Sequence, residues 1–220
     1  MNTLIWYTEN IFRHMLQMLP CMTIALLFWS VIRPWRLKYI EKHGLYSTKR
    51  REIVLLGYVM FCAGLGALTL FPYGFWEEYL RVFVNPGHHP SVQFPSFADS
   101  LVLLRQLPQS ITPFREILRV NHGGPWLWFV LWGNIGMFAP IGFGLPLLWR
   151  NKQWYHALLL GGIISFLIEL IQIFVGRVSD IDDVILNSIG AFFGFCLYFI
   201  CSKVIPLNWD NFHCKKEEAV

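Results

Sequence analysis

The 220-residue chain is 55% hydrophobic and 17% aromatic, whereas only 15% of its residues are charged. Soluble domains contain about 25% charged residues, so this composition excludes a soluble globular protein, a disordered chain and a collagen-like chain. The net charge of +4 comes from 18 basic and 14 acidic residues, and in so apolar a chain we expect it to set membrane orientation rather than to bind nucleic acid. The composition predicts an all-α, polytopic bundle of membrane helices.

Five apolar stretches are long enough to cross a bilayer, which requires about 20 helical residues. In chain order they are residues 16–32, 53–71, 126–149, 157–175 and 184–201. The first lacks a basic leader and a small-residue cleavage site, so we interpret it as an uncleaved span, and residues 4–7 either lengthen its helix or lie in the membrane interface. The chain then divides into a first helix with a basic loop (1–52), a membrane domain (53–206) and a tail (207–220).

The basic residues are unevenly distributed among the connections between these spans. Twelve lie in the first connection, the third connection and the tail, and six lie in the alternate segments. The positive-inside rule places the richer set in the cytoplasm. It therefore predicts that the N-terminus is outside, that the C-terminus is inside, and that the long connection 72–125 lies outside.

This outer connection has two halves of different composition. Its first half is rich in Pro, Gly and His at residues 86–90, which predicts an irregular loop. Its second half, 97–120, carries apolar residues at helical spacing, and Thr112-Pro113 is typical of a helix start. This half is either one or two short amphipathic helices on the outer membrane face or a plain linker.

Neither the histidines nor the cysteines form a metal signature. His88 and His89 are far in sequence from His122, so we expect no bound metal and no other cofactor. The five cysteines include no Cys-x-x-Cys pair, and four of them lie in apolar runs, which predicts buried thiols.

Polar and small residues recur in the last three spans, at helical spacing in the fourth and fifth, and an unpaired polar group there costs several kcal/mol. On the fourth span they are Gly162, Ser165, Glu169, Gln172 and Gly176. On the fifth they are Asp183, Asn187, Gly190 and Gly194, with Asp180 three residues before. On the third they are Asn134, Pro140, Gly142, Gly144 and Pro146, and the two prolines predict a kink or break. Spacings of three and four residues share one helix face, so we expect the three faces to meet.

The helical rise places this polar cluster in the outer half of the bilayer, which predicts a pocket that opens outward. The predicted ligand-binding residues are Asn134, Glu169, Gln172, Arg177, Asp180, Asp183 and Asn187. Structural roles stay open, because Asn134 and Gln172 could bond neighbouring helices and Asp180 could cap the fifth helix. Glu169 must either take up a proton or pair with Arg177.

The order and spacing of these motifs resemble the VanZ-like family over about residues 53–200. The motifs are Asn134-Ile-Gly-Met-Phe-Ala-Pro-Ile-Gly-Phe, Glu169-Leu-Ile-Gln172, Gly-Arg177-Val-Ser-Asp180-Ile-Asp-Asp183-Val-Ile-Leu-Asn187-Ser-Ile-Gly190, and Gly194. The resemblance implies a multi-pass protein of the bacterial plasma membrane. It also implies an association with teicoplanin resistance, by a route that does not rebuild the peptidoglycan precursor terminus. The leading span and the long outer connection exceed what the motifs need.

Three functions fit the sequence. The favoured one is a non-enzymatic envelope protein that binds an amphiphile, either a lipoglycopeptide antibiotic or a lipid-linked envelope component, and contributes to teicoplanin resistance. The second is a membrane enzyme that acts on a lipid head group through the acids near Arg177, although no hydrolase motif is present. The third is a small lipid transporter, for which a homo-oligomer through Gly190 and Gly194 would supply further spans.

Overall fold

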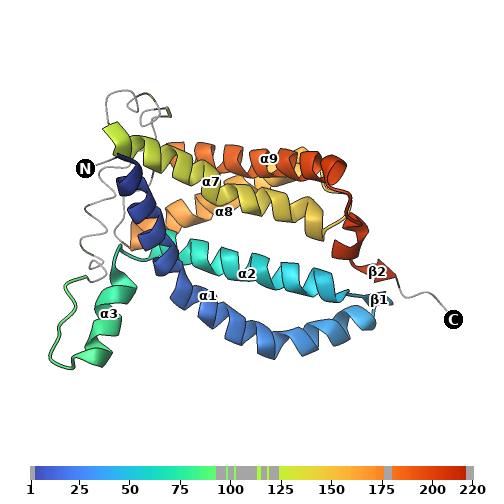
Figure 1. The fold of residues 1–220 in the computed structure, drawn as a ribbon, viewed down its shortest axis with the longest axis horizontal. Coiled ribbons are helices and arrows are strands. Elements are labelled where there is room, and N and C mark those ends of the chain that lie inside the picture. The colour runs from blue at the N-terminus through green and yellow to red at the C-terminus, as the bar shows by residue number, and fades with distance from the viewer. Residues whose placement is uncertain are drawn as a thin grey trace.

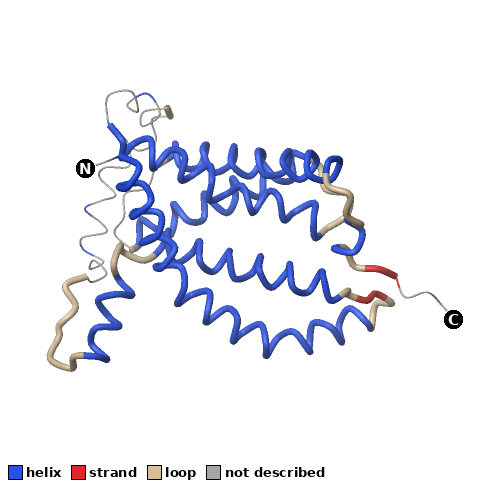
Figure 2. Tube along the Cα trace, in the orientation of Figure 1, coloured by secondary structure: helices blue, strands red, loops and turns tan. Residues whose placement is uncertain are grey.

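The computed structural model describes residues 3–92, 98, 102, 113–114, 118, 124–175 and 180–216. Five helices in these residues are long and apolar enough to cross a membrane. They are α1 (Thr3–Glu41), α2 (Lys49–Leu70), α7 (Gly124–Leu148), α8 (Trp154–Phe174) and α9 (Ile181–Val204). They run side by side in one bundle, with the N- and C-termini at opposite ends (Figures 1 and 2). The predicted all-α membrane bundle is confirmed, and which end faces the cytoplasm stays a prediction.

The bundle is tightest where α7 packs on α9. A Cβ atom at Gly194 would overlap the carbonyl oxygen of Ala139, and one at Gly142 would overlap the carbonyl oxygen of Ala191. Only glycine permits so close an approach of two helix backbones. Gly190 packs in the same way on Ile135, so the glycine pair that the sequence offered for a homo-oligomer is used inside the chain. The homo-oligomer itself stays a prediction.

The buried core lies between these helices and is apolar. It contains Leu65, Phe138, Ile141, Ile168 and Ala191, which come from α2, α7, α8 and α9. The second half of α7 is largely buried in this core. The helix continues without interruption through Pro140 and Pro146, so the predicted break is absent. The Ile141 carbonyl oxygen, next to Pro140, contacts protein: it accepts a hydrogen bond from the Tyr58 hydroxyl at 3.3 Å.

Helix α1 is longer than its predicted span. Its 39 residues extend about 58 Å at 1.5 Å per residue, against a bilayer core of about 30 Å. Residues 4–7 therefore lengthen the helix, and Arg33 and Arg36 lie on its last turns rather than in a loop. Both guanidinium groups reach Glu52 on α2, which explains how basic residues are accommodated there. The part of α1 near the N-terminus leaves α2 and lies beside the start of α7 (Figure 1).

The first half of the outer connection is not irregular throughout, and the prediction was wrong for ten of its residues. Helix α3 (Phe75–Val84) begins after Gly74, whose φ of 76° is in the left-handed region. Glu77 and Glu78 lie in its first turn and Arg81 in its last, as the helix dipole favours. The turn residues at 86–90 obscured this short amphipathic pattern. Thr112 and most of 97–120 lie outside the described residues.

The tail closes the end of the bundle opposite the N-terminus. Strand β1 (Leu45–Tyr46) pairs antiparallel with β2 (Lys215–Lys216), and a short 3₁₀ helix, η2 (Trp209–Phe212), precedes β2. The Thr48 hydroxyl, which caps α2, donates a hydrogen bond to the backbone oxygen of Asn211 at 2.5 Å. The tail is thereby fixed to the first connection.

Candidate functional site

A cavity of about 630 Å³ lies at the end of the bundle where α7 and α9 begin and α8 ends. Five of the seven predicted ligand-binding residues line it: Asn134, Glu169, Gln172, Asp183 and Asn187. They come from three helices, as the polar faces predicted. Asp180 lies just outside the cavity wall, and Arg177 lies outside the described residues, so its predicted pairing with Glu169 is untested.

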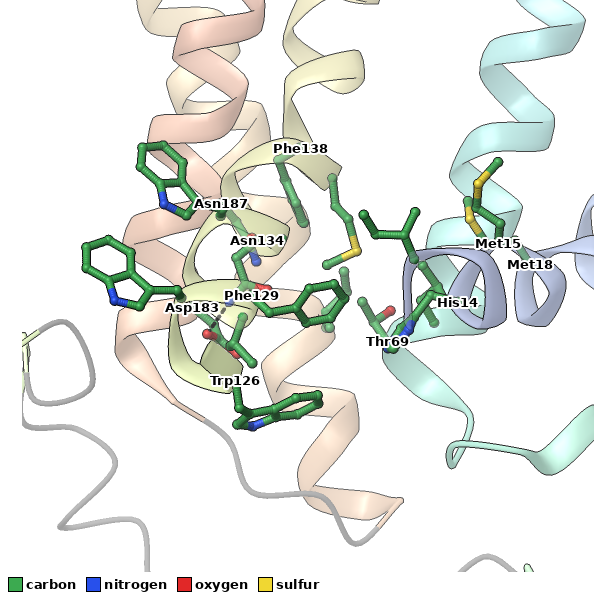
Figure 3. Close-up of a pocket in the computed structure, with 18 of the residues that line it drawn as sticks. His14, Met15, Met18, Thr69, Trp126, Phe129, Asn134, Phe138, Asp183 and Asn187 are labelled. Carbon is green, nitrogen blue, oxygen red and sulfur yellow. Dashed lines mark hydrogen bonds between the residues drawn. The ribbon is translucent and has the colours of Figure 1, made fainter. Parts of the chain in front are cut away.

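A hydrogen bond between an amide and a carboxylate joins α7 and α9 at the polar wall of the cavity. The Asn134 side chain donates a hydrogen bond to Asp183 Oδ1, and both side chains face the cavity (Figure 3). One helical turn below Asp183, Asn187 donates to the Ser165 hydroxyl on α8 at 2.8 Å. The other amide atom of Asn187, Oδ1, is buried and accepts no hydrogen bond from the described residues. The cavity wall thus retains an acceptor that a ligand could use.

The acidic residues between α8 and α9 organise the connection above the cavity. Glu169 is buried, and its Oε2 accepts a hydrogen bond from the Asp180 backbone N–H at 2.8 Å. The Asp180 side chain caps α9 by accepting from the Asp182 N–H at 3.0 Å. Asp182, which is only 1% exposed, accepts from the Phe114 N–H and so fixes a residue of the outer connection. The capping role left open for Asp180 is present.

Gln172 links α8 to α2. Its amide donates to the backbone oxygen of Thr69 at 2.8 Å. Together with the bond from Asn134, this contact shows that both amides join neighbouring helices while lining the cavity. The structural reading of these two residues and the ligand-binding one are therefore compatible.

The opposite wall of the cavity comes from α1, which sequence reasoning did not assign to the site. Its lining residues are Tyr7, Ile11, His14, Met15 and Met18. Figure 3 shows the labelled ones across the cavity from Asn134 and Asp183. Their spacing of three and four residues is that of one helix face, and His14 inside an apolar stretch was a usable signal. Flexible methionines suit a wall that adapts to different ligands.

Aromatic rings of α1 and α7 pack together beside the cavity. The Tyr7 hydroxyl donates a hydrogen bond to the Pro125 oxygen at 2.9 Å. Trp6 packs edge-on against Trp126 and Phe129, with ring centroids 6.1 and 5.9 Å apart. These contacts hold the first turns of α1 against the start of α7.

The cavity combines two chemistries. Carboxylates and amides lie on α7, α8 and α9, and Met, aromatic and aliphatic side chains cover most of the remaining surface. The part of the chain that the structure describes contains no group of three side chains able to hold a metal ion. A space with one polar wall and apolar surroundings can hold an elongated molecule that has a polar head and an apolar tail.

A comparison with known protein families places these helices in a known group. A family model described as VanZ/LLP1 matches residues 59–202, which include α7, α8, α9 and most of α2. The polar wall of the cavity lies within the match, and the α1 wall lies before it. No curated protein and no solved structure matches the chain.

Proposed function

Because the chain belongs to the VanZ/LLP1 family, we propose that it is a multi-pass protein of the bacterial plasma membrane that binds an amphiphile in this cavity. The ligand is a lipoglycopeptide antibiotic or a lipid-linked envelope component, and binding contributes to resistance against teicoplanin. The observation that carries the proposal is the cavity itself. It places the hydrogen-bonding groups of Asn134, Asp183 and Asn187 opposite the methionines and rings of α1.

The size of the cavity supports a particular mode of binding. A volume of about 630 Å³ is within the range of about 300–1,000 Å³ that holds a drug-sized molecule, and it is small for a whole glycopeptide. The acyl tail and its first polar groups enter, and the glycopeptide core stays outside the bundle. The predicted orientation supports this, because it opens the cavity toward the outer leaflet.

Two glycines on α7 provide a matched test. A Cβ atom at Gly133 or at Gly136 would meet no atom within 4 Å, so the backbone admits a side chain at either position, but only Gly133 lines the cavity. Gly133→Leu therefore fills the cavity, whereas Gly136→Leu makes the same chemical change outside it. The chain and both variants are expressed in a susceptible Gram-positive host, and inhibitory concentrations of teicoplanin and vancomycin are measured.

We expect the chain to protect against teicoplanin more than against vancomycin, which lacks the acyl tail. Gly133→Leu should remove this protection and Gly136→Leu should keep it, with both variants present in the membrane at equal amounts. Equal susceptibility with and without the chain would overturn the resistance role. Equal activity of the two variants would overturn the role of the cavity.

The two carboxylates of the cavity favour a second candidate, an enzyme acting on a lipid head group. Glu169 and Asp183 come from different helices and line the same cavity, as a general acid and a general base would. The test is turnover of a labelled polyprenyl or glycerol lipid by the purified chain. Loss of turnover in Glu169→Gln, with the unfolding transition unchanged, would favour the enzyme. Absence of turnover in the unmodified chain would exclude it.

A further inference from the structure

A second cavity, of about 470 Å³, lies at the opposite end of the bundle. The turn between α7 and α8 forms one side of it, with Arg150 and Lys152. The end of α9 and the tail form the other side, with Tyr198, Asp210 and His213. Neither the sequence motifs nor the proposed amphiphile site uses these residues.

Positive charge predominates in this cavity. Arg150 pairs with Asp210, with 3.3 Å between Nη2 and Oδ1, so one acid faces one base. The ammonium group of Lys152 has no carboxylate within ion-pair distance among the described residues, which leaves an uncompensated cation. Helix α8 starts directly after Gln153, which also lines the cavity, and the positive end of its dipole adds to this field. The cavity is therefore suited to an anion.

His213 adds a hydrogen-bond acceptor beside these cations. The side chain is buried, and its Nε2 lies 3.0 Å from the Pro146 carbonyl oxygen. A carbonyl oxygen can only accept, so Nε2 donates this bond, and in the tautomer with its one proton on Nε2 the Nδ1 atom is an acceptor. Nδ1 is buried and makes no hydrogen bond with the described residues, and its nearest charged neighbour there is the Asp210 carboxylate at 3.7 Å, which supplies no donor. A ligand that fits both features has an anionic group for the cations and a hydroxyl group that donates to Nδ1.

The surroundings place the cavity at the level of lipid head groups. Trp149 lines it. Trp154 and Tyr155, the first two residues of α8, are 53% and 45% exposed, as in the aromatic belt of membrane proteins. The same end of the bundle carries most of the basic residues of the chain, which attract anionic lipid. These observations favour a lipid phosphate over a soluble one.

We propose that this cavity binds the head group of an anionic phospholipid that carries a hydroxyl group, of which phosphatidylglycerol is the simplest example. The phosphate lies between Arg150 and Lys152, and a head-group hydroxyl donates to His213 Nδ1. The lipid thereby bridges the α7–α8 turn and the tail.

The test uses the full chain in nanodiscs of phosphatidylcholine that contain a minor fraction of phosphatidylglycerol. The variant Arg150→Gln/Lys152→Gln removes two positive charges from the cavity. The variant Lys49→Gln/Arg50→Gln removes two exposed charges from the same end outside it. Retained phosphatidylglycerol is counted by native mass spectrometry. We expect a loss of about tenfold or more in the first variant and little change in the second, because each basic group near the lipid phosphate contributes separately.

Two further arms sharpen this result. Phosphatidylmethanol has the same phosphodiester charge but no head-group hydroxyl, so the chain should retain it less well than phosphatidylglycerol. The charge-preserving variant Arg150→Lys/Lys152→Arg should keep binding, which separates lost charge from a folding defect. Equal loss in both glutamine variants would overturn the site in favour of diffuse attraction. Equal retention of the two lipids would overturn the role of His213, and displacement by millimolar inorganic phosphate would assign the cavity to a soluble phosphate compound.

Discussion

The two ends of the bundle use charge in opposite ways. At the end with the larger cavity, the described residues include seven acids and two bases: Glu9, Glu77, Glu78, Glu169, Asp180, Asp182, Asp183, Arg13 and Arg81. At the tail end, the residues that the structure describes include twelve bases and three acids, Glu41, Glu52 and Asp210. The acidic end encloses a cavity between separated helices. The basic end is fastened by ion pairs and by the tail.

The ion pairs that join α1 to α2 at the basic end share one carboxylate. Glu52 is 5% exposed and lies among Arg33, Arg36 and Arg51, with hydrogen bonds from Arg36 and from the Ser47 hydroxyl. At the acidic end, the buried polar groups instead face an open space that they share. The comparison teaches that the buried carboxylate of Glu52 joins helices at one end, whereas the buried carboxylate of Glu169 lines a cavity at the other.

The largest change in stability should come from the close packing of α7 on α9. Gly194→Ala forces a methyl group onto the Ala139 carbonyl and should lower the free energy of unfolding by about 3 kcal/mol, the upper range for overpacking. Gly136→Ala on the facing helix meets open space and should stabilise by up to about 1 kcal/mol. Denaturation in a fixed detergent measures both. Equal behaviour of the two variants would contradict the close α7–α9 packing.

The next largest change in stability is expected from a substitution at the basic end. Glu52→Ala leaves three guanidinium groups without their shared acid and should lower the free energy of unfolding by about 3 kcal/mol, as for a broken buried pair. The control is Glu77→Ala, because the pair of Glu77 with Arg81 is exposed and should matter by only about 0.3–0.5 kcal/mol. A small effect of Glu52→Ala would show that the tail contacts alone fasten this end.

A smaller effect is expected in the polar wall of the larger cavity. Gln172→Leu removes the bond to the Thr69 carbonyl, and interhelical hydrogen bonds in membranes average about 0.6 kcal/mol. Ile171→Leu, at the neighbouring 42% exposed position, conserves volume and should have no effect. A loss of several kcal/mol from Gln172→Leu would mean that the amide mainly stabilises the fold and that the two ends are more alike than proposed.

The smallest effect is expected from lowering the pH, which should weaken the contact between Glu78 on α3 and the connection that follows it. The Ser91 N–H, and after it His88, hold the pKa of Glu78 below its usual value. A lowered pKa means that this contact stabilises the folded connection above the ordinary glutamate pKa and is lost as the pH falls through the lowered one. The protection of the Ser91 amide from hydrogen exchange, taken relative to its intrinsic rate at each pH, should fall at strongly acidic pH in the unmodified chain. In Glu78→Gln this protection should be low already at neutral pH, and identical protection in both chains at every pH would contradict the contact.

Sequence periodicity predicted those features that depend on residues of one helix. The five spans and the polar faces follow from composition and a 3.6-residue period, and the structure brings Asn134, Glu169 and Asn187 of these faces to one cavity. The α1 wall was missed because its partners are more than a hundred residues away, as the Tyr7–Pro125 bond illustrates. The pairing of β1 with β2 was also missed, because two-residue strands have no recognisable sequence pattern.

The division of the larger cavity between the first helix and the last three has a consequence for biogenesis. The apolar wall leaves the ribosome first, in α1, and the polar wall is complete only when α9 has been inserted. Until then the buried amides and carboxylates of α7 and α8 lack their partners on α9, such as the Asn134–Asp183 and Ser165–Asn187 bonds. A nascent chain stalled before α9 would therefore expose hydrophilic groups to lipid, which makes it a natural substrate for membrane quality-control proteases.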